Sequence, residues 1–404
     1  MSPAMLRLAL VLGLMGAIGP FAIDMYLPAL PTIAADYGTS VAATQMTLTA
    51  YFLAFGAAQL VYGPLADRYG RKPPLYVGLV IFFMGSIGAA LAPSIESLAA
   101  WRFVQGLGAA AAMVVPRAVI RDLHTGTEAT RLMAAIMLVI SISPMLAPLA
   151  GSLLLLVGGW RDIFFVLAVA SGLSLVLLFF QLPETLAPAN RVPIEARTLL
   201  RDARRLLTDR TFLVLTFVGG FGMASFFVFI ASASFVYTQQ FGLSAFGFSL
   251  AFALNAIGFF AATQFAATLG ERYGMARVVS RAVIGFATCA FVLLALVLAG
   301  LGSLFVIVGL LFLGNVCLGL VIPATMVMAL DEHGDVAGLA SSLGGTLQMV
   351  AGGVIIAAAG PFFNGSATPM VVSIALCAAA ALVLSRLIVT ARAPAAADDA
   401  DGNR

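Results

Sequence analysis

Charged side chains inside long apolar stretches are the residues of this sequence most able to do chemistry. Of the eighteen acidic residues, only Asp24 lies clearly within such a stretch, and Arg102 and Arg117 are basic residues in a similar setting. A carboxyl group there can take up and release a proton, whereas a guanidinium stays charged at any physiological pH. Asp24 is therefore the predicted proton carrier, and Arg102 is expected to tune the acidity of a neighbouring carboxylate.

Twelve apolar runs must position these side chains. The chain of 404 residues is 62% hydrophobic and only 10% charged, whereas a soluble domain carries roughly 25% charged residues. Each run is long enough to cross a bilayer as a helix, which predicts an all-α polytopic membrane protein with twelve transmembrane helices. The runs lie near 4–26, 41–65, 74–92, 97–120, 131–157, 162–182, 211–237, 245–269, 278–299, 303–330, 336–360 and 368–390.

Several classes of function lack their sequence signals here. Cys289, Cys317 and Cys377 lie within apolar runs without metal-ligand spacing, and His124 and His333 lie in loops without other ligands nearby. There is no nucleophile–base pattern, no phosphate-binding loop and no basic patch outside the loops beside the spans. We therefore expect no enzyme, no metal, no cofactor and no nucleic-acid partner.

The depth of the charged residues in the predicted spans suggests how they interact. Asp24 lies at the outer end of the first span and Arg102 lies five residues into the fourth, so a pair at similar depth would offset the cost of burying each charge. Alternatively, Asp24 is interfacial and caps the loop near Pro28. Arg117 lies roughly 22 Å beyond Arg102, where it either extends to the membrane surface or faces a cavity.

The spans divide into two sets of six on either side of a polar stretch. We expect a first bundle at 1–182, a cytoplasmic linker at 183–210 that is partly an amphipathic helix, and a second bundle at 211–390. Residues 391–404 are expected to form a disordered cytoplasmic tail. A short repeat supports the division, since Gly270-Glu271-Arg272-Tyr273-Gly274 echoes Ala66-Asp67-Arg68-Tyr69-Gly70 at the equivalent loop of the second set.

Three motifs resemble signatures of the major facilitator superfamily. The loop at 63–73, Gly-Pro-Leu-Ala-Asp-Arg-Tyr-Gly-Arg-Lys-Pro, resembles its loop between helices 2 and 3, and Arg102 with Gln105 and the small residues after it resembles its second signature. Residues 143–151 resemble the antiporter signature, with Ser143 and Ala147 in place of the usual glycines. The resemblance implies two six-helix bundles in a pseudo-twofold arrangement. It also implies a gating motif, which comprises Gly63, Asp67, Arg68, Gly70, Arg71 and Asp122. A helix-bending motif is implied as well, which comprises Pro144, Pro148 and Gly151.

Within that superfamily the chain resembles the Bcr/CflA drug-resistance subfamily. The segments that carry this resemblance are 24–28, the loop 63–73, Pro116-Arg117 with Arg121-Asp122, Leu330-Asp331-Glu332, and Ala337-Gly338 with 340–343. It implies a monomeric, proton-coupled exporter of bicyclomycin-, chloramphenicol- or sulfonamide-type drugs in the bacterial inner membrane. It also implies that Asp122 joins Asp67 and Arg71 in a cytoplasmic charge cluster, although unrelated surface charges would give the same sequence.

Aromatic and amide side chains in the spans suit a drug-sized apolar ligand with a few hydrogen bonds. The candidate cavity residues are Tyr26, Tyr51, Gln105, Arg117, Phe226, Phe227, Asn255 and Gln348. Helix packing is the alternative explanation for each of them. Other possible functions are a metabolite or sugar-type exporter on the same fold, and a membrane sensor without transport.

Basic residues predict that both termini and the linker are cytoplasmic. With the N-terminus inside, only Arg161 falls outside, and Arg102 and Arg117 fall within a span, which leaves 18 of the 21 basic residues on cytoplasmic segments. A Thr198→Cys variant that lacks the native cysteines should therefore resist an impermeant thiol reagent added to whole cells. Labelling of the introduced thiol from the outer face would contradict this orientation.

Overall fold

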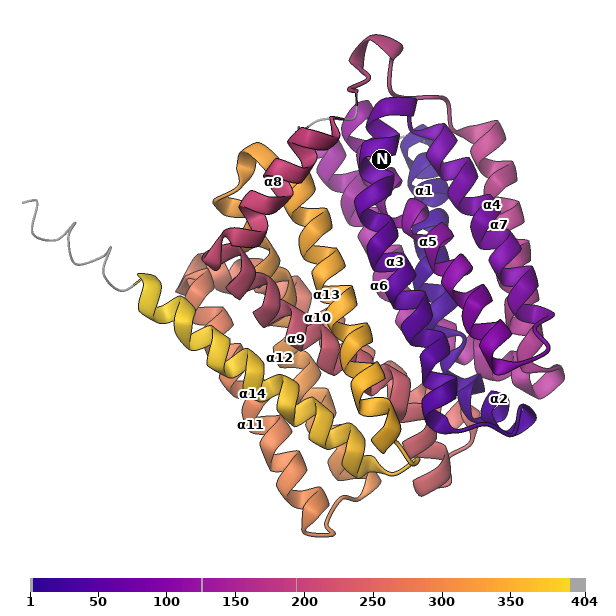
Figure 1. Ribbon diagram of the computed structural model, residues 1–404, viewed down its shortest axis with the longest axis vertical. Coiled ribbons are helices and arrows are strands. Elements are labelled where there is room, and N and C mark those ends of the chain that lie inside the picture. Colours follow the sequence, from indigo (N-terminus) through magenta and orange to yellow (C-terminus); the bar gives the residue numbers. More distant parts are fainter. Residues whose placement is uncertain (1–2, 125, 194, 393–404) are drawn as a thin grey trace, which may run out of the picture. The chain divides into compact units, whose positions relative to one another are not determined.

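The computed structural model describes residues 3–124, 126–193 and 195–392. Within these residues the chain forms helices and no strands (Figure 1). The helices are α1 (Pro3–Asp24), α2 (Leu30–Asp36), α3 (Val41–Tyr69), α4 (Lys72–Ala90), α5 (Ile95–Leu123), α6 (Gly126–Val157), α7 (Trp160–Gln181), α8 (Ala196–Thr208), α9 (Arg210–Phe235), α10 (Ala245–Tyr273), α11 (Met275–Leu298), α12 (Leu304–Asp331), α13 (Ala337–Ala359) and α14 (Ala367–Arg392). The shorter elements are η1 (Leu27–Ala29), η2 (Pro188–Asn190), the π-helical η3 (Val236–Gln240), η4 (Gly334–Val336) and η5 (Gly360–Phe362).

Twelve helical segments of the described chain are long and apolar enough to cross a membrane, which confirms the predicted fold class. The first differs from its prediction, because it continues through η1 and α2 to Asp36 instead of ending near residue 26. Pro28 and Pro31 stand in the opening turns of η1 and α2, where a missing backbone N–H is tolerated. The helix is therefore interrupted just after Asp24 and restarts.

The predicted linker contains one long helix, and the predicted tail is mostly outside the described residues. Helix α8 has four arginines, and its Leu206 is buried while Leu200 and Leu207 are exposed. At the chain's end, α14 continues to Arg392. The prediction of disorder from residue 393 onward lies outside the part of the chain that the structure describes.

Serine side chains cap four of the spanning helices in the described chain. The hydroxyl oxygens of Ser40, Ser94, Ser244 and Ser303 accept hydrogen bonds from the backbone N–H three residues on, at the beginnings of α3, α5, α10 and α12. The first backbone N–H groups of a helix have no partner within it, and such capping supplies one. The residue just before each of these helices therefore specifies where the helix begins.

Packing divides the helices into two compact units. Unit 1 comprises residues 1–196, 230–253 and 356–365, and unit 2 comprises 197–229, 254–355 and 366–404. Helices α9, α10 and α13 thus have residues in both units. These units follow packing rather than the order of the spans, so the division at 1–182, 183–210 and 211–390 stays a prediction.

In unit 1, glycines allow close contacts between helices. Helix α5 packs along α3 and α4, and α1 packs along α6. A Cβ atom on Gly106 would collide with the backbone carbonyl of Tyr51, and one on Gly108 would collide with the backbone of Phe82. Small residues let the backbones of membrane helices approach each other, so these two glycines set the spacing of α5 against its neighbours.

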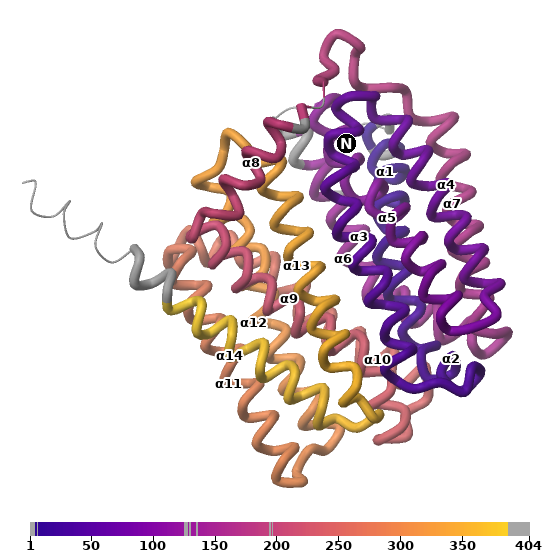
Figure 2. Tube along the Cα trace, in the orientation of Figure 1, coloured from indigo at the N-terminus to yellow at the C-terminus, as the bar shows by residue number. Residues whose placement is uncertain are grey.

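Unit 2 contains a second tightly packed group. Helix α11 packs against both α12 and α14 (Figure 2). Cys377 and the apolar side chains around it are buried in this unit. Cys289 and Cys317 belong to the same unit and are partly buried, so all three cysteines are reduced thiols within the helical packing.

A methyl group at Gly106 should destabilise unit 1. In the Gly106→Ala variant the new Cβ would meet a backbone atom, which cannot move aside as a side chain would, so we expect a loss of about 1–3 kcal/mol. Thermal unfolding of the purified protein in detergent measures this loss. Gly309→Ala is the control, since a Cβ there meets nothing within 4 Å, and equal melting temperatures for the two variants would contradict the prediction.

Candidate functional site

A fully buried arginine lies between three aromatic rings in unit 1. The guanidinium carbon of Arg102 is 4.4 Å from the ring centre of Tyr51, 4.7 Å from that of Tyr26 and 5.8 Å from that of Phe164. The exposed fraction of Arg102 is 0%. Cations are attracted to the faces of aromatic rings, and more strongly where water is excluded. The rings therefore compensate part of the cost of burying this charge.

Hydrogen bonds hold one side of the Arg102 guanidinium. Its Nη1 donates to the carbonyl oxygen of Ala22 at 3.0 Å and to Oε1 of Gln105. The Nε2 of Gln105 donates in turn to Ser86 Oγ at 2.8 Å. The Nε and Nη2 groups of Arg102 are buried without a hydrogen-bond partner. The arginine therefore keeps two unused donors inside unit 1.

The Asp24 carboxyl group lies close to this network along the chain but makes no ion pair with Arg102 in this structure. Asp24 is the last residue of α1 and is 4% exposed. Among the described residues its side chain has no hydrogen-bond or ion-pair partner, and Arg102 contacts the Ala22 carbonyl instead. The expected Asp24–Arg102 pair is thus not formed here. An ionised carboxylate without a partner is costly to bury.

The predicted cavity residues of the first half gather around Arg102. Tyr26, Tyr51 and Gln105 are completely buried. The Tyr26 hydroxyl is hydrogen-bonded to Thr47 Oγ1 at 2.8 Å, and the Tyr51 hydroxyl donates to the carbonyl of Gly19 at 3.1 Å. Their polar atoms are therefore engaged within unit 1, and a direct contact with substrate stays a prediction.

Arg117 is in a different environment from Arg102. It lies on the same helix but is exposed, and the described residues offer it no hydrogen-bond or ion-pair partner. Pro116 beside it is buried. The two alternatives for Arg117, a membrane-surface position and a cavity position, both require such an exposed side chain.

The candidate residues of the second half lie in unit 2 and are mostly engaged with neighbouring side chains. The Phe226 ring stacks on that of Phe259, with ring centres 5.1 Å apart. Asn255 accepts a hydrogen bond from Asn315 at 3.1 Å. Phe227 is 5% exposed, and its ring lies where a Cβ of Gly352 would be. The next candidate, Gln348, differs because its buried Nε2 has no partner.

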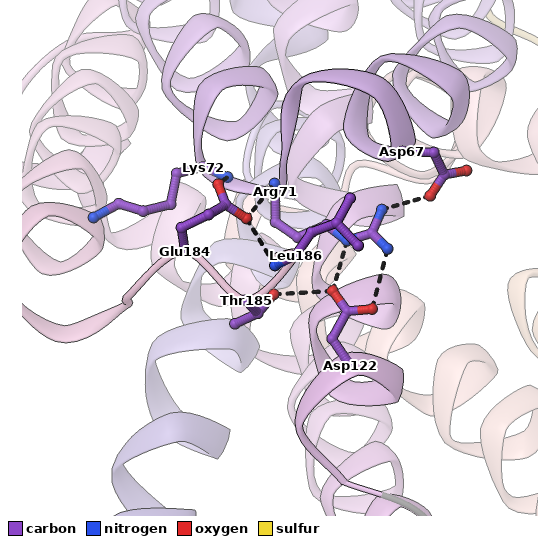
Figure 3. Close-up of polar contacts among 7 residues, drawn as sticks. All are labelled: Asp67, Arg71, Lys72, Asp122, Glu184, Thr185 and Leu186. Atoms are coloured by element: carbon purple, nitrogen blue, oxygen red, sulfur yellow. Dashed lines mark hydrogen bonds and ion pairs between the residues drawn. The ribbon is translucent and has the colours of Figure 1, made fainter. Parts of the chain in front are cut away.

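The predicted charge cluster forms at the loop between α3 and α4 (Figure 3). Arg71 donates from Nη1 to Asp67 Oδ1 at 2.6 Å, from Nε to Asp122 Oδ2 at 2.7 Å and from Nη2 to Asp122 Oδ1 at 3.1 Å. The fork of Arg71 therefore binds both oxygens of Asp122, an arrangement that adds strength and direction. Burial acts to lower the pKa of Arg71, but the bonds to Asp122 and Asp67 outweigh it and raise that pKa above its ordinary value.

Two residues of the predicted linker complete the cluster and were missed by sequence reasoning. Glu184 accepts hydrogen bonds from the backbone N–H of Arg71 at 2.8 Å and of Lys72 at 3.1 Å (Figure 3). Thr185 donates from Oγ1 to Asp122 Oδ2 at 3.0 Å. Glu184 thereby caps the start of α4 from 113 positions away. Its only sequence signal is that it is the first acidic residue after the sixth span.

The protonation of Glu184 is coupled to this capping. Burial acts to raise the pKa of Glu184, but backbone N–H groups that donate to it outweigh burial and hold the pKa below its ordinary value. A lowered pKa in the folded state means that the capping stabilises the fold fully above the ordinary carboxyl pKa. That stabilisation is lost as the pH falls through the lowered value.

The sequence repeat corresponds to a repeat of backbone geometry. Gly70 and Gly274 both have positive φ, at 99° and 86°, between successive spanning helices. The preceding arginines stack alike, with Arg68 5.2 Å from the ring centre of Tyr69 and Arg272 5.3 Å from that of Tyr273. Positive φ is accessible to glycine at little cost. Gly63, in contrast, has open space around it.

The helix-bending motif lies in α6 next to the interruption of the first span. Pro144 and Pro148 are inside this helix. Gly151 faces Met25, and a Cβ on Gly151 would collide with the Met25 backbone. The Pro148 carbonyl accepts a hydrogen bond from Ser249 at 2.9 Å. Gly151 thus lets α6 approach the chain directly after Asp24, while the bend itself stays a prediction.

The two carboxylates that bind Arg71 should differ in their contribution to stability. The Asp122 side chain is 16% exposed and binds in a bidentate manner, whereas that of Asp67 is 54% exposed. We expect Asp122→Asn to lower the free energy of unfolding by about 1–3 kcal/mol and Asp67→Asn by less than about 1 kcal/mol. Thermal unfolding in detergent ranks the two variants. An Asp67→Asn variant less stable than Asp122→Asn would contradict the prediction.

Comparison with known proteins places these features in a family. The family model described as Major Facilitator Superfamily matches residues 12–357. The chain is 34% identical to "Uncharacterized MFS-type transporter YdgK" of Bacillus subtilis, over 87% of each chain. It is 30% identical to "Bicyclomycin resistance protein homolog" of Haemophilus influenzae, over 95% of this chain and 96% of that protein.

Solved structures share the fold at low sequence identity. The crystal structure of the nucleoside transporter NupG matches with a TM-score of 0.74 and 16% identity, over 96% of this chain and 99% of that one. The twelve candidate spans and the loop 63–73 agree with the family match. The chain belongs to the major facilitator superfamily of transporters, and within it to the Bcr/CflA-type drug-resistance proteins.

Proposed function

We propose that this protein exports small amphipathic drugs of the bicyclomycin, chloramphenicol or sulfonamide type, driven by the inward flow of protons. The names of relatives refer to bicyclomycin and chloramphenicol resistance and so support the first two of these drug types. The observation that carries proton coupling is Asp24, a buried carboxyl group without a partner inside a membrane span. No other acidic residue of the chain lies so clearly within an apolar run.

The proposed cycle uses the change of charge on Asp24. Deprotonated Asp24 faces the cytoplasmic side and permits drug binding, and protonation from outside accompanies drug release. Burial of an ionised carboxylate is costly, so the protonated form is the one able to return across the apolar interior. Arg102 is a fixed charge bonded to the Ala22 carbonyl, two residues before Asp24, and it acts by rearranging its two unused donors as Asp24 titrates.

The Arg71 cluster is the proposed cytoplasmic latch of this cycle. The two six-helix halves, 1–182 and 211–390, would alternate in exposing the site. Ion pairs that hold Asp67, Arg71 and Asp122 together on one surface favour one of two states, and a ligand with different affinity for those states shifts their populations. Such a latch needs no cofactor or metal, and the described residues contain no group of three metal-ligating side chains.

We place the protein in the bacterial inner membrane with both termini in the cytoplasm. The basic residues of the loop 63–73 and of α8 support this orientation by the positive-inside rule. We expect a monomer, as the family resemblance implies. An exporter of metabolites or sugars on the same fold would transport a different panel of compounds, and the same transport assay separates the two functions.

Replacement of Asp24 by asparagine should uncouple transport. An amide cannot titrate, so Asp24→Asn should abolish drug accumulation driven by a pH gradient in inverted membrane vesicles, a loss of at least about tenfold. The measurement is uptake of radiolabelled chloramphenicol and bicyclomycin, together with drug-dependent proton movement in proteoliposomes.

Asp202→Asn is the matched control for this experiment. It makes the same change in α8, outside the spans, where Asp202 pairs with Arg201, and it should transport at the wild-type rate. If Asp24→Asn still exchanges protons for drug, the proton carrier is another residue. If wild-type vesicles accumulate neither compound, the proposed substrate class is wrong.

A further inference from the structure

Helices α9 and α13 meet in unit 2 along a seam lined with glycine. Gly219 and Gly220 of α9 lie against the Gln348 side chain, and Gly344 of α13 lies opposite Thr216. Farther along, Gly352 of α13 lies against the ring of Phe227. Gly344, Gln348 and Gly352 are spaced by four residues and so share one face of α13. We call this set of contacts the α9–α13 seam.

Two polar atoms in this seam are buried without partners. They are Oγ1 of Thr216, a residue 2% exposed, and Nε2 of Gln348, a residue 7% exposed. Within the described part of unit 2, they are the buried side-chain nitrogen and oxygen atoms that lack a hydrogen bond. Both lie on the same seam, although this unit contains many other polar side chains.

Other polar residues of unit 2 show how such groups are usually satisfied. Thr325 donates to the carbonyls of Val321 and Ile322 in its own helix, the ordinary behaviour of a threonine in a helix. Asn315 and Asn255 pair with each other. The Thr216 hydroxyl could likewise donate to a backbone carbonyl of its own helix, but it makes no such bond. The two unpartnered groups are therefore exceptions that require a different partner.

The geometry of the seam specifies that partner. Thr216 and Gly219 are three residues apart on α9, and Gly344 and Gln348 are four apart on α13, so the two polar groups are separated by about 5 Å along the seam. Helix α13 contains no charged residue, and α9 contains only Arg210 at its start. A neutral molecule with two hydrogen-bonding oxygens at that separation matches these groups, whereas an apolar cation does not.

We propose that the α9–α13 seam is a subsite for the polar part of the transported compound. Gln348 donates from its amide to a carbonyl or hydroxyl oxygen, and Thr216 exchanges a hydrogen bond with a second such group. Glycine at position 219 admits the Gln348 amide to the seam, because a Cβ there would lie only 2.9 Å from Nε2. The proposal rests on the proposed function and adds to it a preference for neutral drugs with paired hydroxyl, carbonyl or amide groups. Compounds without such groups bind without using the seam.

Two near-isosteric variants test the subsite. Gln348→Met and Thr216→Val remove the hydrogen-bonding groups and keep most of the side-chain volume. Each should weaken equilibrium binding of chloramphenicol, which carries hydroxyl and amide groups, by about three- to tenfold. The same variants should bind tetraphenylphosphonium, which has no hydrogen-bonding group, as the wild type does. Binding is measured on the full-length purified protein in detergent.

Matched controls make the same substitutions elsewhere. Gln181→Met, at the exposed end of α7, and Thr288→Val, whose hydroxyl bonds to its own helix at Ile284, should bind both compounds as the wild type does. Melting temperatures of all four variants show whether each one is folded, and a folded Gln348→Met or Thr216→Val suffices for the test.

The outcomes separate the subsite from the proposed function. Unchanged chloramphenicol binding in both seam variants would overturn the subsite alone. Equal weakening for both compounds would also overturn it, because the loss would then not depend on hydrogen bonding. Wild-type protein that binds neither compound would overturn the proposed function, and the subsite with it.

Discussion

The burial of one guanidinium determines how the spans of unit 1 meet. Arg102 is fully enclosed, and its surroundings come from four separate spans: Ala22 and Tyr26 from the first, Tyr51 from α3, Phe164 from α7 and Gln105 from α5 itself. A charge in such a place is tolerated only where rings and hydrogen bonds replace water. These spans must therefore keep one mutual arrangement, and Asp24, two residues beyond Ala22, is positioned by it.

The cost of burying an arginine is compensated differently at the loop between α3 and α4. Arg71 is also buried, but its partners there are carboxylates, Asp67 and Asp122, rather than aromatic rings. Glu184 and Thr185 attach the segment after the sixth span to this cluster. The carboxylates of this cluster lie near the end of the helices and are partly exposed, at 54% for Asp67 and 16% for Asp122. The residues around Arg102 are fully buried instead.

The repeated loop shows which features of the first half are retained in the second. The backbone geometry is retained, since Gly70 and Gly274 share positive φ, and so is the stacking of arginine on the following tyrosine. The Arg-Lys pair after Gly70 is replaced by Met275 and Ala276 after Gly274. The second loop therefore turns the chain in the same way but cannot hold the same carboxylates. At this position the second half repeats the backbone turn of the first half but not its charge cluster.

The local structure of the chain could be predicted from its sequence, but the partners of its polar groups could not. Apolar runs of about twenty residues predict twelve spans because every backbone group in a bilayer must be paired within a helix. The joining of Asp67, Arg71 and Asp122 also followed, from a family resemblance. The Glu184 cap, the rings around Arg102 and the unpaired atoms of Thr216 and Gln348 did not. Each depends on side chains brought together by helix packing, such as Arg71 and Glu184 at 113 positions apart. Hydropathy records that a residue is inside a span, but only the packed helices decide which groups face it and whether a partner is within reach.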